Sequence, residues 1–344
     1  MFAAFLIMFV GGAIGWVGLS VFAFLVYGFS TTSICIFLAA CALIFQCFLV
    51  FDYQFQAILK ARISSLCKSA ALLAGIALKV LIIQFDYGIE YVVAAYLFDH
   101  VIVAAFLCYL AISNQCFFLP KYNIGGEVRC LLRAALPMTL SAFAIAAYAS
   151  VDKLFVLNSQ GSVGLGLYAS ATRLVDGVSM LFVVVCVSIL PILIGMKKNN
   201  NEKYVVNMVR GFAVIFWGGA IGAAAVFFYS KEIMSLLFGD SFSRAEEVLE
   251  VSIWSVIFLG FGSLTVRYMI VEGLERYLSF RSMVMVVGNV LFCWLLVPRY
   301  GEIGAACSVL ISVFLSNYVF DAVFKETRPL FLLKTKAILL IGLR

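Results

Sequence analysis

The sequence predicts an all-α polytopic membrane protein with about ten membrane-spanning helices. Of its 344 residues, 65% are hydrophobic and only 12% are charged, and the mean hydropathy is +1.11. Roughly a quarter of the residues of an ordinary soluble domain are charged. The apolar residues form continuous runs close to the ~20 residues that a helix needs to cross a bilayer. Spanning β-strands would instead give short segments of alternating polarity.

Ten apolar runs define the predicted spans, and each is near the length of one bilayer crossing. They cover about residues 2–27, 31–51, 64–84, 90–112, 131–156, 164–195, 207–229, 248–271, 279–297 and 303–323. The longest break, 114–130, contains Pro120 and two glycines, and we interpret it as a linker between two bundles. The predicted organisation is an N-terminal lobe of four spans (1–113), the linker (114–130), a C-terminal lobe of six spans (131–323) and a basic tail (324–344).

Basic residues gather in alternate loops, which indicates the orientation of the chain. One set of loops and the tail carry 17 of them, whereas the opposite loops carry only Lys231, Arg244 and Arg299. Because basic loops remain in the cytoplasm, the linker, the tail and both termini are predicted to be cytoplasmic. The net charge of +6 follows from this distribution and gives no indication of nucleic acid as a partner.

Four charges lie at membrane depth around a short polar turn at 158–163. Asp152 and Lys153 end the fifth predicted span, and Arg173 and Asp176 lie inside the sixth. A charge at the bilayer centre costs about 2.5–3.5 kcal/mol and normally faces a partner or a wet cavity. One interpretation is structural pairing, with Arg173 bound to Asp176 or to Asp152. The other is a polar cavity in which Arg173 and Lys153 attract an anionic group, since the guanidinium fork matches phosphate.

Three other spans carry charges that invite two interpretations each. Asp99 and His100 sit in the middle of the fourth span, either as a helix–helix hydrogen bond or as a proton relay, because histidine titrates near neutral pH. Lys79 and Arg267 lie near the ends of their spans. They are either interfacial anchors or further contacts for a substrate.

Composition and motifs favour transport over catalysis. His100 is the only histidine, and seven of the ten cysteines fall inside apolar runs, where they pack as small apolar residues. We therefore predict no metal site, no cofactor and no enzymatic activity. Two functions remain as alternatives at this point. One is a transporter, a cation-coupled drug or metabolite exporter, and the other is an enzyme, a membrane glycan polymerase or acyltransferase. A polymerase should show a large basic outer loop, whereas the longest predicted outer loop is the short segment 230–247.

Four stretches give the chain a resemblance to a known family. They are FQAILKARI (55–63), VDKLFVLNSQGSVGLGLYASATRL (151–174), LLFGDSFSRAEEVLEVSIW (236–254) and VPRYGEIGAACSVLIS (297–312). In this order and spacing they resemble bacterial O-antigen and polysaccharide flippases. That family belongs to the multidrug/oligosaccharidyl-lipid/polysaccharide (MOP) exporter superfamily, which also contains the drug-extrusion (MATE) antiporters. The likeness covers most of the chain.

The resemblance implies a MATE-like two-lobe helical bundle that works by alternating access in the bacterial inner membrane. Its substrate would be an undecaprenyl-diphosphate-linked oligosaccharide, the repeat unit of an O-antigen or capsule. Membrane lipids and the glycan polymerase machinery would be its partners. The candidate substrate-binding residues are Arg173, Lys153, Asp152, Asp176, Lys79 and Arg267, and the candidates for proton coupling are Asp99 and His100.

The front of the chain departs from the family pattern. The family has about twelve helices in two lobes of six, and the first span of this chain resembles the third helix of the family. We therefore expect an incomplete N-terminal lobe without the first two helices. A fragment, a late start site and a degenerate gene product all fit that expectation.

Overall fold

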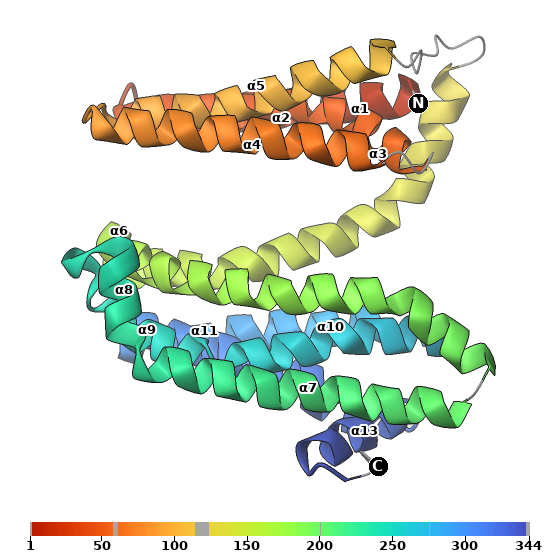
Figure 1. Cartoon of the computed structure of the whole chain (residues 1–344). Coiled ribbons are helices and arrows are strands. Elements are labelled where there is room, and N and C mark those ends of the chain that lie inside the picture. The colour runs from red at the N-terminus through yellow and green to blue at the C-terminus, as the bar shows by residue number, and fades with distance from the viewer. Residues whose placement is uncertain (1, 58–60, 114–123, 200, 275, 342–344) are drawn as a thin grey trace. The chain divides into compact units, whose positions relative to one another are not determined.

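The computed structural model describes residues 2–57, 61–113, 124–199, 201–274 and 276–341. These residues form helices joined by short turns, and none of them lies in a β-strand (Figure 1). They divide into two compact units, Met1–Pro137 and Met138–Arg344, which we call the N-terminal and C-terminal units. Within the described residues, eight helices are long and apolar enough to cross a membrane. Two of the eight fold back on themselves, so the predicted ten segments are present.

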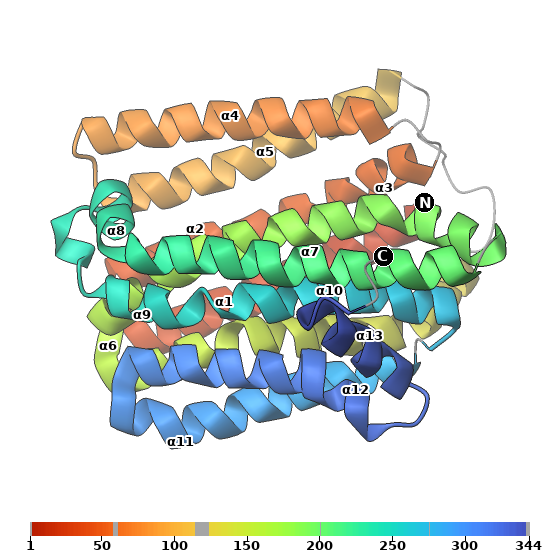
Figure 2. The ribbon, with the colours of Figure 1, turned by 60° about the horizontal axis from the view of Figure 1, so that its bottom comes forward.

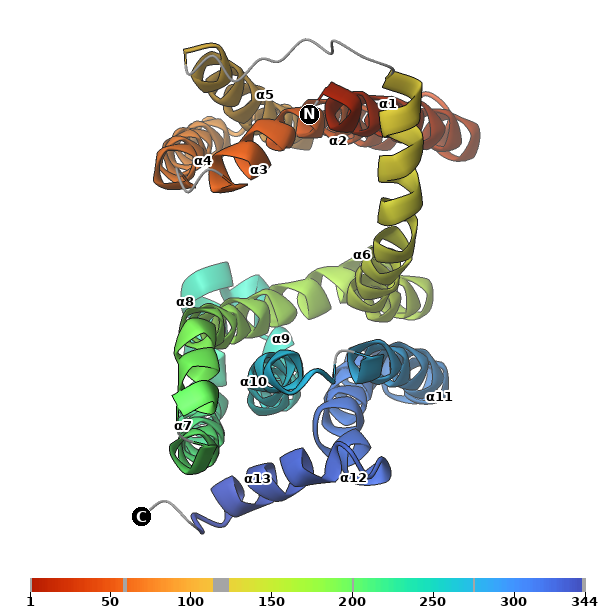
Figure 3. The ribbon, with the colours of Figure 1, turned by 90° about the vertical axis from the view of Figure 1, so that its right-hand side faces the viewer.

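The described part of the N-terminal unit contains five complete helices, a short turn and the start of a sixth helix. They are α1 (Phe2–Tyr27), α2 (Thr31–Phe45), the 3₁₀ turn η1 (Gln46–Phe48), α3 (Leu49–Ala57), α4 (Ala61–Gln84) and α5 (Ile89–Ser113). α2 packs against α1 and α5, and α4 packs against α5 (Figure 3). Ser30 caps the N-terminus of α2: its side chain accepts a hydrogen bond from the Ser33 amide, and the Ser33 hydroxyl accepts one from the Ser30 amide. This capping box fixes the start of the helix.

The long helix α6 (Ile124–Asn199) is a hairpin rather than one rod. The chain reverses at Gly161, where φ is 70° and ψ is −166°, a backbone conformation that is essentially restricted to glycine. The two arms run back beside each other (Figure 1). The reversal falls within the turn predicted at 158–163.

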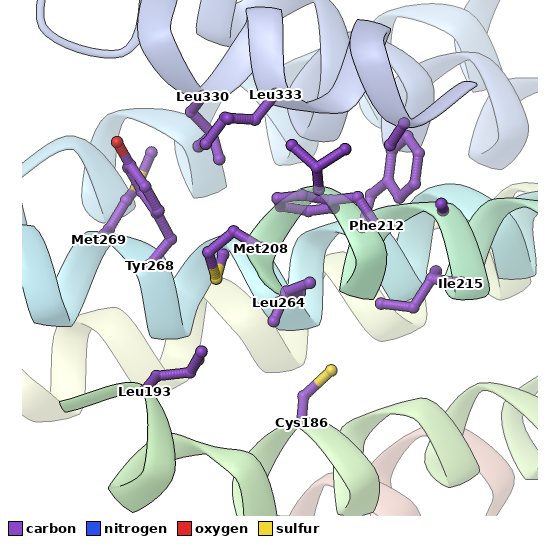
Figure 4. Close-up of a cluster of buried hydrophobic side chains, with 14 of the residues drawn as sticks. Cys186, Leu193, Met208, Phe212, Ile215, Leu264, Tyr268, Met269, Leu330 and Leu333 are labelled. Carbon is purple, nitrogen blue, oxygen red and sulfur yellow. The ribbon is translucent and has the colours of Figure 1, made fainter. Parts of the chain in front are cut away.

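The rest of the C-terminal unit follows this hairpin in the chain. Its elements are α7 (Asn201–Phe228), α8 (Ser230–Phe238), η2 (Asp240–Phe242), α9 (Ala245–Ser252), α10 (Ser255–Glu272), α11 (Arg276–Phe314), the π-helical turn η3 (Leu315–Val319), α12 (Phe320–Val323) and α13 (Arg328–Ile338). α11 reverses at Gly301 (φ 55°, ψ −131°) and its second arm continues through η3 into α12 (Figure 2). α13 returns to pack on α7. A buried cluster from α6, α7, α10 and α13 holds one half of this unit together (Figure 4).

The reversal at Gly301 gives a stability prediction. A Cβ there would stand 2.7 Å from Nε2 of Gln160, beside the other hairpin turn, and the positive φ itself is unfavourable for an L-residue. We expect Gly301→Ala to destabilise the fold by about 1–2 kcal/mol, seen as a lower midpoint of thermal unfolding in detergent. Gly222→Ala is the matched control, because its Cβ meets no atom within 4 Å. An equal midpoint for the two variants would contradict the prediction.

Candidate functional site

A small polar cavity lies inside the C-terminal unit, and we call it the Asp152 cavity. Its volume is about 130 Å³. Both arms of α6 line it, together with α9, the start of α10 and the second arm of α11. The polar lining side chains are Tyr148, Asp152, Lys153, Tyr168, Thr172, Asp176, Ser252 and Ser255. A polar cavity among apolar helices is where a bilayer protein handles a polar ligand or a proton.

The hairpin places Tyr168 against Asp152. The turn at Gly161 falls near the middle of the 16 residues that separate them, so the two side chains meet across the arms. The Tyr168 hydroxyl donates a hydrogen bond to Asp152 Oδ2 at 2.6 Å. Tyr168 is fully buried and Asp152 is 7% exposed. The partner of Asp152 is thus a neutral hydroxyl, and not Arg173 as one interpretation of the sequence proposes.

The other three charges of this hairpin are more accessible. Lys153 is half-buried and donates to the carbonyl oxygen of Ala149 at 3.0 Å. Arg173 and Asp176 are exposed, and neither forms an ion pair with another residue that the structure describes. Asp176 nevertheless reaches the lining of the Asp152 cavity, which brings two of the predicted carboxylates to one site.

In the N-terminal unit, Lys79 and Asp99 form an ion pair between α4 and α5. Gly75 lies one turn before Lys79, and the Asp99 carboxylate packs in the space that a side chain at this position would occupy. The two residues were separate candidates in the sequence, and the structure brings them together. A partner for an intramembrane aspartate is what the desolvation penalty requires.

His100 lies beside this ion pair but faces a different neighbour. Its Nδ1 is 3.0 Å from the carbonyl oxygen of Tyr96, and the two rings are 4.6 Å apart. Asp99 and His100 both line a cavity of about 480 Å³, to which Gln46 and Lys68 also contribute. The described part of this unit therefore has its own polar cavity.

The hydrogen bond that the structure describes for Arg267 of α10 is a local one. Its Nη1 donates to the carbonyl oxygen of Ser263, one turn earlier, at 3.4 Å. One turn further, Glu272 accepts two hydrogen bonds from Lys197 of α6, at 2.6 and 2.8 Å. This pair joins the ends of α6 and α10 and leaves Arg267 with a half-buried charge.

The two fully buried charges among the described residues are Lys334 and Asp321, at the end of the C-terminal unit. Lys334 of α13 is fully buried and donates to Asp321 Oδ2 at 2.5 Å and to the carbonyl oxygen of Asn317 at 2.6 Å. Burial lowers the pKa of Lys334 from 10.5 to about 8, and the charge of Asp321 opposes that shift. Arg281 is also buried, and Asp321 acts electrostatically on both cations.

The positive-inside rule concerns only the side of the membrane on which basic residues lie, and it does not distinguish exposed positions from buried ones. In α13 the buried positions are Leu330, Leu333, Lys334 and Ala337. Their spacing of three and four residues is the apolar stripe of a packed helix. That pattern was the available signal that Lys334 points inward.

No group of three or more His, Cys, Asp or Glu side chains among the described residues is placed to hold a metal ion. The Asp152 cavity, the Lys79–Asp99 pair and the Arg281–Asp321–Lys334 cluster are separate polar sites.

Comparison with known proteins finds likeness in structure but not in sequence. No family model matches the chain, and no curated protein matches it. The lipid II flippase MurJ in an inward closed conformation superposes with a TM-score of 0.75 at 13% identity, over 98% of this chain and 76% of that one. An inward-facing MATE-family multidrug resistance transporter gives 0.69 at 15% identity, over 96% and 80%. A MOP superfamily transporter from Pyrococcus furiosus gives 0.65 at 14%, over 98% and 79%.

These identities are low, so the likeness concerns the fold. The neighbours are transporters and a flippase rather than enzymes. The chain is a multi-pass helical membrane protein with the fold of the MOP superfamily transporters.

Proposed function

We propose that this protein transports a lipid-linked oligosaccharide across the bacterial inner membrane by alternating access. The observation that carries the proposal is the fold, which superposes over nearly the whole chain on a lipid II flippase. The four sequence stretches that resemble polysaccharide flippases favour an O-antigen or capsule repeat unit on undecaprenyl diphosphate as the substrate. The exposed position of Arg173 leaves its guanidinium accessible to such a diphosphate.

The proposed site consists of Arg173 and Lys153, assisted by Arg267 and Lys79. Each has the positive charge that a diphosphate requires, and each lies in a membrane-crossing segment. We further propose that Asp152 and Asp176 exchange partners with these cations during the cycle, and that Asp99 and His100 couple the cycle to protons. Both termini would lie in the cytoplasm, as the basic loops predict.

A cation-coupled exporter of the same fold is the second candidate, and one observation favours it. The Asp152 cavity is lined by two carboxylates and one ammonium group. That balance suits a cationic ligand better than a diphosphate.

Complementation separates the two candidates. The gene is expressed in a strain that lacks its O-antigen flippase, and surface polysaccharide is measured by gel electrophoresis and by labelling of intact cells. We expect polysaccharide to return to the surface, with unchanged tolerance to cationic drugs. Raised drug tolerance without surface polysaccharide would support the exporter. Membrane-inserted protein that produces neither result would refute both.

A further inference from the structure

The terminal helix α13 has two faces of different character. The buried positions of its inner face, which packs on the bundle, are Leu330, Leu333, Lys334 and Ala337. The opposite side is exposed, and we call it the outer face of α13; it consists of Arg328, Leu332, Lys336 and Leu339. Steps of three and four residues keep these four side chains on one side of the helix. Figure 3 shows α13 at the edge of the C-terminal unit.

The spans that α13 touches indicate its depth in the membrane. Lys334 lies against the ring of Phe212 in α7 and is bound to Asp321. Arg210 and Asp321 each bound a charge-free stretch of a span, 211–228 and 303–320. Both stretches are close to the ~20 residues of one bilayer crossing, so the bounding charges mark the edge of the hydrocarbon. α13 therefore lies at that edge, where lipid headgroups meet acyl chains.

Basic and leucine side chains alternate along the outer face. Leu332 is 56% exposed and Leu339 is 61% exposed. Arg328 and Lys336 are also exposed, and neither forms an ion pair with another residue that the structure describes. A helix face of this composition suits the membrane interface, with its apolar side chains at the acyl boundary and its basic groups at lipid phosphates.

The charge next to this face is also positive. Lys325, in the turn that precedes α13, is exposed. The adjacent carboxylate, that of Glu326, lies 3.8 Å from the guanidinium of Arg276 and is therefore already compensated. Arg328 donates through Nε to the carbonyl oxygen of Ala322 at 3.2 Å, a contact that orients its guanidinium and leaves its charge. Three exposed cations thus gather at one end of the C-terminal unit.

The combination of cations and leucines selects the partner. A soluble polyanion would match the cations but not the leucines. An uncharged lipid surface would match the leucines but would leave the cations without partners. An anionic phospholipid satisfies both, and anionic lipids give the cytoplasmic leaflet the negative surface potential that attracts basic segments.

We propose that the outer face of α13, together with Lys325, binds the headgroups of anionic phospholipids in the leaflet that the basic loops predict to be cytoplasmic. Lipid would then hold α13 from outside, while the Lys334–Asp321 pair holds it from inside. The proposal concerns the attachment of the terminal helix and does not depend on which substrate is transported.

The test is hydrogen exchange of the α13 backbone amides, measured by mass spectrometry on the full chain in lipid nanodiscs. One set of nanodiscs contains phosphatidylcholine alone, and the other contains an equal mixture with phosphatidylglycerol of the same acyl chains. We expect exchange in 328–338 to be about tenfold slower with phosphatidylglycerol. The physical reason is that local opening of α13 must then separate its cations from the anionic surface.

A charge-removal variant and a matched control locate the lipid contact. The combined variant Lys325→Gln, Arg328→Gln and Lys336→Gln should abolish the difference between the two nanodiscs. The control combines Lys231→Gln, Arg244→Gln and Arg299→Gln, which removes three exposed cations from the opposite loops and should retain the difference. Because the readout is local to α13, lipid bound at those loops does not enter it.

Two results would overturn the proposal: equal exchange of wild-type α13 in the two nanodiscs, or a full difference in the combined variant. Lys336→Gln alone changes one exposed side chain of the outer face and should reduce the difference about twofold, so the test does not depend on the folding of the combined variant. Complementation is a separate measurement. Absence of surface polysaccharide would refute the proposed function and leave lipid binding at α13 unaffected.

Discussion

Lys334→Met is expected to lower the free energy of unfolding by about 3–5 kcal/mol, because it leaves the carboxylate of Asp321 buried without its counter-ion. Both side chains have no exposed area, and Lys334 also satisfies the carbonyl oxygen of Asn317. Its ammonium group lies 5.5 Å from the ring centroid of Phe212 and 5.8 Å from that of Phe261. These contacts tie α13 to α7, α10 and the π-helical turn η3. The measurement is unfolding by denaturant of the detergent-solubilised protein.

Two further variants show whether the ion pair causes the loss. Lys336→Met removes an exposed lysine two residues along the same helix and should change stability by less than ~1 kcal/mol. Lys334→Met combined with Asp321→Asn removes both charges of the pair and should recover part of the lost stability; recovery is incomplete because the buried Arg281 then loses the carboxylate that acts on it. The prediction fails if Lys334→Met and Lys336→Met have the same free energy of unfolding.

Arg173→Ala is expected to abolish transport while the protein inserts normally. Its side chain is exposed in the structure and makes no ion pair with a described residue, so its loss leaves no buried charge unpaired. If the guanidinium binds the diphosphate, Arg173→Lys keeps the charge but loses the planar fork, and transport should be impaired rather than abolished. Surface polysaccharide in the complemented strain is the measurement, with the amount of protein in the membrane fraction determined in parallel.

Arg299→Ala is the matched control for this substitution. Arg299 is likewise exposed, lies near the turn at Gly301 and belongs to none of the proposed sites. It should leave surface polysaccharide unchanged. Full surface polysaccharide from Arg173→Ala would remove Arg173 from the site.

The fold was predictable because bilayer crossing imposes length and polarity on every segment. The turns at Gly161 and Gly301 both fall at breaks in the predicted spans, and each break contains a glycine that accepts positive φ. The end of the chain was less predictable. Its alternation of apolar and basic residues fits a helix on the membrane surface, whereas α13 buries Leu330, Leu333 and Lys334 against the bundle.

The candidate site was found in part, and only through its charges. Asp152 and Asp176 stood out because intramembrane carboxylates are rare. Tyr148, Tyr168 and Ser255 line the same cavity, but neutral hydroxyl side chains do not stand out in an apolar segment as charged ones do. The Tyr168–Asp152 hydrogen bond depends on where the hairpin reverses, and a turn placed only within 158–163 does not fix which residues face each other across the arms.

The π-helical turn at Leu315–Val319 has a consequence for the end of the chain. A π turn accommodates one more residue than an α turn. If the same residues formed an ordinary α-helix, the residues after them would be rotated by one position, about 100° around the helix axis. Asp321 would then rotate away from Lys334, and α13 would lose its anchor. The π-helical conformation of these five residues and the packing of α13 therefore depend on each other. A change that converts the turn to α-helix should release α13, and the Lys334 contacts in turn stabilise the π-helical turn.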